Sequence, residues 1–304
     1  RQFAQAESHY RRAIELEPHL AGPWTDLGLL YMQTGEEDAA REALEEAHRR
    51  DDFRADVVNY LNLLRELKDF RTVETEHFVV KVDGEHDAVL LEQVADYAEA
   101  AYREVCGDFS HEPDRRTLVE IFPTHPQFSV RISGRGWLGT VGACTGRVIA
   151  LVAPNRERSD FGTYNWATVI RHELTHTVTL SATGNRIPHW LTEACAVWEQ
   201  PDRMNYDAVR VLVRATRTGS LAPVGELDWK FIRPQRAGDR SLAYAQAEGQ
   251  SPSQARRMSL SRALSVRSYL IEIGIDTGRI DVRALGNTAP SAPLDRVDVK
   301  VVQR

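Results

Sequence analysis

Long apolar runs are missing from this sequence of 304 residues. The longest run, 148–153, has six residues, whereas a membrane-spanning helix needs about 20. The sequence therefore predicts no transmembrane segment. An excess of positive charge is missing as well, because 44 acidic residues outnumber 38 Lys and Arg and give a net charge of -6. This balance excludes the basic footprint that is typical of nucleic-acid binding.

Cysteine is scarce: only Cys106, Cys144 and Cys195 occur, far apart and without a C-x-x-C pair. The spacing excludes a disulfide ladder, and the odd number leaves at least one thiol unpaired within the chain. Hydrophobic residues (42%) and charged residues (27%) are present in the proportions of a folded protein. The length predicts two or three domains. Because Arg1 already stands within a helical pattern, we expect further sequence upstream of it.

The first 50 residues contain an internal repeat with a period of 34 residues. The positions that match are Ala6, Tyr10 and Ala13 with Ala40, Leu44 and Ala47. Between them lies W-x-x-L-G-x-x-Y, formed by Trp24, Leu27, Gly28 and Tyr31. This pattern resembles the tetratricopeptide repeat, in which small residues let paired helices approach closely. The resemblance implies a domain over 1–70, closed by a third helix over 55–70, that binds a protein partner. The alternative is a plain helical hairpin.

The middle of the chain mixes strands and helices. We expect strands over 77–82 and 117–122, a hairpin over 140–152 that turns at Thr145-Gly146, and helices over 87–105, 165–180 and 188–200. Asn165 is a suitable N-cap for the second of these helices. A loop is expected over 219–238, which contains two prolines and three glycines. The hairpin favours an α+β fold over a doubly wound sheet.

The strongest motif is H-E-x-x-H, formed by His172, Glu173 and His176 on the predicted helix 165–180. Histidines four residues apart share one helix face, so both imidazoles can bind one metal ion. Glu173 stands next to the first histidine, where its carboxylate can take a proton from an attacking water. Zinc is the expected cofactor, and a catalytic zinc needs a third protein ligand beside an open position.

The candidate for the third ligand is Glu193, 17 residues after His176 on the predicted helix 188–200. The surrounding sequence, Trp190-Leu191-Thr192-Glu193-Ala194, resembles the gluzincin metallopeptidases and, more closely, the peptidase-MA-like families that follow tetratricopeptide repeats. The resemblance covers about 74–248. It implies a zincin-like α+β core that hydrolyses peptide bonds, with His172, His176 and Glu193 as zinc ligands and Glu173 as the base.

The sequence leaves the roles of several neighbouring residues undecided. Many gluzincins carry an Asp four residues after the ligand Glu to orient a histidine, whereas this position is Val197 here and Glu199 is out of register. His189, four residues before Glu193, is an alternative ligand or a substrate contact, although a surface histidine is the simpler interpretation. Cys195 is expected to pack rather than to bind metal. By resemblance, Tyr244 is a catalytic candidate that would stabilise the developing oxyanion.

The last segment, 249–304, differs in charge: it carries +4, which leaves -10 for the residues before it. Its pattern, from Met258-Ser259-Leu260 through Arg262 to Val299, resembles the second half of an OmpA-like peptidoglycan-binding domain. The resemblance implies that Arg262 contacts the peptide stem of peptidoglycan. The partner Asp of that family falls at Ala247, and the first half of the domain is missing. We expect weak peptidoglycan binding at most.

The sequence thus predicts a multidomain protein: all-α tetratricopeptide helices, then an α+β zincin-like core, then a partial α/β OmpA-like segment. The predicted function is a zinc metallopeptidase that acts on a peptide or protein substrate. The alternative is a non-catalytic tetratricopeptide scaffold, or a cell-envelope protein that binds peptidoglycan. The predicted location is the bacterial cell envelope or periplasm, with the cytoplasm as the alternative.

Overall fold

The computed structural model describes residues 2–154, 164–201, 206–235 and 238–249. The chain forms two compact units. The first contains Arg1–Tyr102 and Asp114–Thr177, and the second contains Arg103–Pro113 and the chain from Val178 onward. Among the described residues, no helix has both the length and the apolar composition that crossing a membrane requires.

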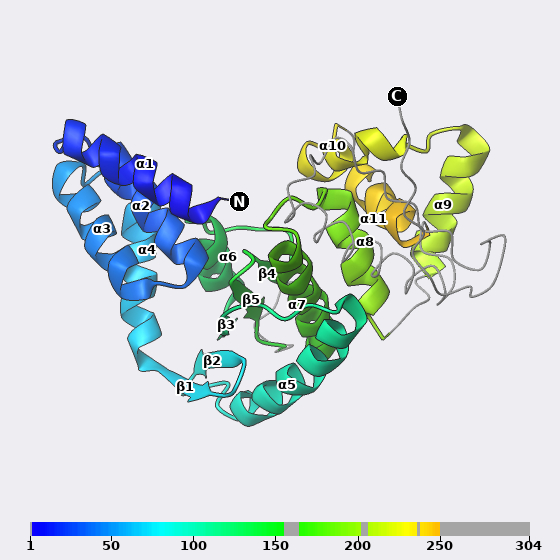
Figure 1. Ribbon diagram of the computed structural model, residues 1–304, viewed down its shortest axis with the longest axis horizontal. Helices are drawn as coiled ribbons and strands as arrows, with labels where there is room; N and C mark the ends of the chain where they lie inside the picture. Colours follow the sequence, from blue (N-terminus) through cyan, green and yellow to red (C-terminus); the bar gives the residue numbers. More distant parts are fainter. Residues whose placement is uncertain (1, 155–163, 202–205, 236–237, 250–304) are drawn as a thin grey trace, which may run out of the picture. The chain divides into compact units, whose positions relative to one another are not determined.

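The first unit begins with four helices, α1 (Phe3–Leu16), α2 (Ala21–Thr34), α3 (Glu37–Arg50) and α4 (Ala55–Glu66) (Figure 1). The W-x-x-L-G-x-x-Y pattern lies on α2, as the repeat predicts. Gly28 has a clear packing role there, because a Cβ atom at this position would lie 2.6 Å from Leu44 Cγ. The missing side chain lets α2 and α3 approach closely, which explains the glycine of the repeat pattern.

A mixed five-stranded sheet follows in the order β1-β2-β3-β5-β4. Its strands are β1 (Phe70–Glu74), β2 (Phe78–Asp83), β3 (Thr117–Phe122), β4 (Gly142–Cys144) and β5 (Val148–Val152). The predicted strands and the hairpin are confirmed, but β1 was not expected. The central neighbours β2, β3 and β5 are parallel, and only the outer pairs β1–β2 and β4–β5 are antiparallel. The predicted antiparallel hairpin therefore lies at one edge of the sheet, whereas the central strands are parallel.

The repeat helices pack on one face of this sheet together with α6 (His125–Ser133), which the sequence analysis missed. Apolar residues of β3 and β5, namely Phe122, Ala150 and Val152, share one core with side chains of α2, α3 and α4. A fully buried ion pair lies in this layer: Arg131 Nε on α6 is 2.7 Å from Glu120 Oε2 on β3. Arg131 Nη1 also donates to the carbonyl of Met32 on α2, at 2.7 Å.

Two long helices, α5 (Leu90–Phe109) and α7 (Trp166–Ala182), contact residues that point away from the repeat layer. The rings of Tyr102 on α5 and Phe78 on β2 meet edge to face, with centroids 5.8 Å apart. On α7, Thr177 Oγ1 lies 3.3 Å from Cys144 Sγ on β4. The edge strand β4 is thus held directly against α7, the helix that carries the H-E-x-x-H motif.

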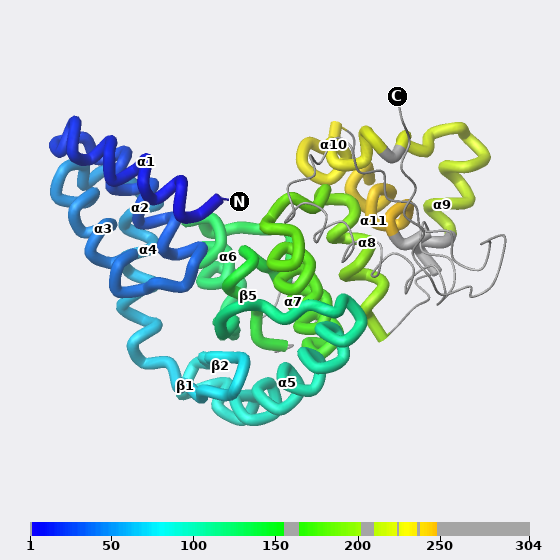
Figure 2. The backbone as a smooth tube through the Cα atoms, viewed as in Figure 1, coloured from blue at the N-terminus to red at the C-terminus, as the bar shows by residue number. Residues whose placement is uncertain are grey.

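The second unit is helical and contains α8 (His189–Glu199), α9 (Tyr206–Thr218), α10 (Leu227–Ile232) and α11 (Asp239–Gly249) (Figure 2). A short 3-10 helix, Val224–Glu226, precedes α10. These two elements fall within 219–238, so the prediction of an uninterrupted loop there is wrong. The reason is packing: Leu227 and Phe231 are buried against Ala194 of α8 and Ala243 of α11. Such long-range burial overrides the loop-like composition.

Candidate metal centre

Helix α7 carries the two histidines and the glutamate of the motif. Asn165 caps its start, because Asn165 Oδ1 accepts hydrogen bonds from the backbone N–H of Ala167 and Thr168 at 3.1 and 3.4 Å. This confirms the predicted N-cap and fixes the register of the helix. His172 is half-buried, whereas Glu173 and His176 are buried. The polar side chains of the motif thus face the protein rather than solvent.

Glu193 is carried by α8, and its backbone is held by contacts on both sides. Thr192 Oγ1 lies 2.8 Å from Thr179 Oγ1, a buried contact that joins α8 to the last turns of α7. At the start of α8, the backbone N–H of Trp190 donates to Asp228 Oδ1 on α10 at 2.7 Å. Because a helix leaves its first N–H groups without intrahelical partners, Asp228 acts as a cap supplied by another element.

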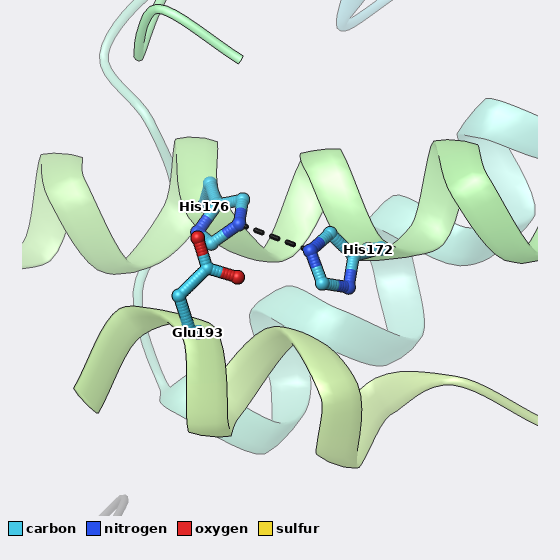
Figure 3. Close-up of side chains that lie close together, drawn as sticks. All are labelled: His172, His176 and Glu193. Carbon is cyan, nitrogen blue, oxygen red and sulfur yellow. Dashed lines mark hydrogen bonds between the residues drawn. The ribbon is translucent and has the colours of Figure 1, made fainter. Parts of the chain in front are cut away.

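The structure brings the three predicted ligands together. One ligand atom from each of His172, His176 and Glu193 lies within 4.8 Å of the others. Figure 3 shows the two imidazole rings on successive turns of α7, with the carboxylate of Glu193 reaching toward them from α8. The Nε2 atoms of His172 and His176 are 3.2 Å apart. Within the described residues, this is the one group of three or more such side chains that could hold a metal ion.

The donor set fits zinc. Two nitrogen donors bound tetrahedrally at about 2.0–2.1 Å from a zinc ion would be about 3.3 Å apart, close to the observed 3.2 Å between the imidazole Nε2 atoms. Nitrogen and carboxylate oxygen are both common ligands of zinc in proteins. His172, His176 and Glu193 are therefore the residues that would hold the ion. Their role as ligands stays a prediction.

Glu173 lies beside the edge strand β4. A Cβ atom at Gly142 would be 3.2 Å from Glu173 Oε1 and 2.4 Å from Val169 Cγ1. Only a glycine leaves room for α7 at this distance. The proposed base and the backbone of β4 are consequently in close proximity.

His189 and Tyr244 lie in one row of aromatic contacts. His189 Nε2 is 3.5 Å from Glu193 Oε1, and the His189 side chain is 44% exposed. Its ring meets Phe231 edge to face at 5.2 Å, and Phe231 meets Tyr244 in the same way at 5.0 Å. His189 thus lies close to the predicted ligand Glu193. The oxyanion role of Tyr244 stays a prediction.

Other residues around Glu193 are packed. Cys195 is buried, and its burial, with the nearby Glu199 carboxylate, raises the pKa of the thiol to about 12. The thiol therefore stays protonated near neutral pH, as expected of a packing residue rather than a metal ligand. Val197 is half-buried and Glu199 is buried.

The residues from 250 onward, with Arg262, lie outside the described residues. The resemblance to half of an OmpA-like domain therefore stays a prediction. The domain limits at 70, 74, 248 and 249 and the predicted location also stay predictions.

Sequence reasoning also gave no role to Gly142, His125 or Trp137. A signal for Gly142 was available: alternation along the predicted hairpin places Gly142 and Cys144 on one face. That this face packs against the H-E-x-x-H helix could be known only from the fold.

Comparison with known proteins supports the repeat alone. A family model described as a tetratricopeptide repeat matches residues 1–65, which include α1, α2, α3 and most of α4. Repeats of this kind present surfaces that bind other proteins. No curated protein and no solved structure matches the chain significantly.

Proposed function

We propose that this protein is a zinc-dependent peptidase whose metal is held by His172, His176 and Glu193. The observation that carries the proposal is the convergence of these three side chains within 4.8 Å. The resemblance of the H-E-x-x-H and W-L-x-E segments to peptidase-MA-like sequences supports the same function. The tetratricopeptide match supports a protein-binding role more directly than catalysis.

The chemistry that zinc supplies at such a site is Lewis acidity, which polarises a carbonyl and makes water a stronger acid. Glu173 is the residue on α7 that accepts the proton of the attacking water. Its carboxylate then passes this proton to the nitrogen of the leaving amine. Burial of Glu173 (7% exposed) excludes bulk water and strengthens its interaction with the developing charge.

The edge strand β4 is suited to bind an extended peptide. Thr145 N donates to the carbonyl of Val148, and Val152 N donates to the carbonyl of Val141, both at 2.9 Å. In an antiparallel ladder such pairs alternate with pairs whose backbone groups point away from the partner strand. Gly142, which is buried, therefore directs its N–H and C=O away from β5, beside Glu173. Its carbonyl accepts a hydrogen bond from Thr140 Oγ1 at 3.0 Å. A substrate that adds a strand here would bring its backbone to the proposed base.

A second candidate function is a non-catalytic scaffold, which the tetratricopeptide match favours. In this alternative the repeat helices bind a protein partner, and the residues around His172 serve only the fold. The two functions differ in one observable, since a scaffold does not hydrolyse peptides. A peptidoglycan-binding function through 249–304 is a separate proposal, tested by sedimentation of the Arg262→Ala variant with purified peptidoglycan.

The test of the peptidase is hydrolysis of an unfolded protein such as casein by the zinc-loaded chain. We expect activity that a chelator removes and that added zinc restores. The Glu173→Gln variant should keep its zinc and lose about two to four orders of magnitude in rate, because glutamine cannot accept the proton. Activity of Glu173→Gln within a few-fold of the unsubstituted protein would remove Glu173 from the mechanism. A complete lack of activity in the zinc-loaded protein would favour the scaffold.

A further inference from the structure

An exposed tryptophan stands on the loop that leads into the edge strand β4. Trp137 is 59% exposed. It precedes Gly142 by five residues, in a segment that contains Gly134, Gly136 and Gly139. The position places a partly exposed indole next to β4, the strand that lies beside Glu173.

The loop around Trp137 is held in place by α6. His125 is 1% exposed, and its ring lies 4.6 Å from the ring of Trp137. The Nε2 atom of His125 is 3.1 Å from the carbonyl oxygen of Thr140. A carbonyl only accepts, so Nε2 is the donor. Ser129 Oγ on the same helix accepts a hydrogen bond from Leu138 N at 3.0 Å. The indole is therefore positioned before any ligand binds.

The same contacts continue to the proposed base. Thr140, whose carbonyl accepts from His125, donates through Oγ1 to the carbonyl of Gly142 at 3.0 Å. Gly142 in turn leaves the space in which Glu173 lies. An extended peptide paired with β4 would thus run from Glu173 toward Trp137. A tryptophan fixed by its neighbours offers a large apolar contact at a small cost in conformational entropy.

We propose that Trp137 is a specificity-determining residue that selects peptides with an aromatic or large aliphatic side chain a few residues from the scissile bond. The inference rests on the proposed function, because it places the substrate on β4. It deepens that function by naming a substrate class: extended peptides with one apolar anchor. A negatively charged side chain at the same position would not be attracted to the indole face, because the face of an aromatic ring carries partial negative charge.

The test separates binding from cleavage. The probes are fluorescently labelled eight-residue Gly/Ser peptides that carry one Phe, one Ala or one Asp at each position in turn. Binding to zinc-loaded Glu173→Gln is measured by anisotropy. We expect Phe at one position to bind about tenfold more tightly than Ala or Asp there. The Trp137→Ala change in this background should remove the preference, and Trp137→Phe should retain most of it.

The matched control is Trp229→Ala, since Trp229 on α10 is similarly exposed at 60%. It should leave the preference unchanged. A preference that survives Trp137→Ala, or the absence of any preference in the Glu173→Gln protein, would overturn the inference. The failures are distinguishable. Chelator-sensitive cleavage without a Trp137-dependent preference overturns this inference alone. A Trp137-dependent preference without cleavage by the unsubstituted protein overturns the peptidase and leaves the peptide site.

Discussion

At the residue scale, the candidate site combines a local motif with one distant residue. His172, Glu173 and His176 are four residues apart at most, so helical periodicity alone predicts that the histidines share a face. Glu193 lies on another helix, and its approach depends on the contacts Thr179–Thr192 and Trp190–Asp228. The ligand set therefore has a part that sequence spacing predicts and a part that tertiary packing decides.

Zinc affinity distinguishes whether Glu193 or His189 is the third ligand. Loss of a residue that only contacts a ligand typically costs about 10- to 100-fold in metal affinity. We expect Glu193→Ala to exceed this range, because a direct ligand is lost, and His189→Ala to fall within or below it. Competition titration against a chelator of known affinity measures both. A larger loss in His189→Ala than in Glu193→Ala would make His189 the ligand.

At the element scale, the site depends on how closely β4 approaches α7. The sequence predicted β2, β3, β5 and the turn at Thr145-Gly146, because apolar and β-branched runs bounded by turn residues identify buried strands. It missed β1, whose burial pattern is irregular, and α6, a helix of nine residues. It also missed the parallel pairing of the central strands. Pairing is a long-range property that no local pattern encodes.

Gly142→Ala tests this close approach. The new Cβ atom would lie 2.4 Å from Val169 Cγ1, so α7 or β4 must move. Overpacking of this kind typically costs about 1–3 kcal/mol, and the displaced Glu173 should lower the rate of hydrolysis. Gly139→Ala is the control, because nothing lies within 4 Å of its Cβ position. Denaturant unfolding of both variants measures the cost. Equal stability of the two would show that α7 and β4 are not tightly packed at this point.

At the scale of the whole molecule, the first unit joins the repeat helices to the sheet that supports the site. The sequence predicted a tetratricopeptide segment followed by an α+β core, and the order of helices and sheet agrees with that prediction. It did not predict that α2, α3 and α4 would share a core with β3 and β5. A shared core of this kind arises from apolar residues far apart in sequence, so periodicity within each element does not reveal it.

The buried ion pair Glu120–Arg131 should contribute strongly to the stability of the packing between the repeat helices, α6 and the sheet. Breaking a buried ion pair by removal of one partner typically costs about 3–5 kcal/mol, because the other charge stays buried. We expect Arg131→Met to lower the free energy of unfolding by about this amount, and Glu120→Leu in the same chain to recover much of it. Arg116→Met is the control, since the Arg116–Glu74 pair is exposed and should contribute about 1 kcal/mol or less. Urea unfolding measures these free energies. Equal losses of stability in Arg131→Met and Arg116→Met would contradict a stabilising role of the buried ion pair.

The most direct test of the central claim is the zinc content of the purified protein, measured by mass spectrometry of the metal after dialysis. The arrangement of His172, His176 and Glu193 predicts one zinc ion per chain, and a value near zero for His176→Ala. His19→Ala is the matched control, because the His19 side chain is 74% exposed and lies in the turn between α1 and α2, away from the H-E-x-x-H motif; it should keep the full content. A His176→Ala protein that retains zinc like the unsubstituted chain, or an unsubstituted chain that binds none, would contradict the account.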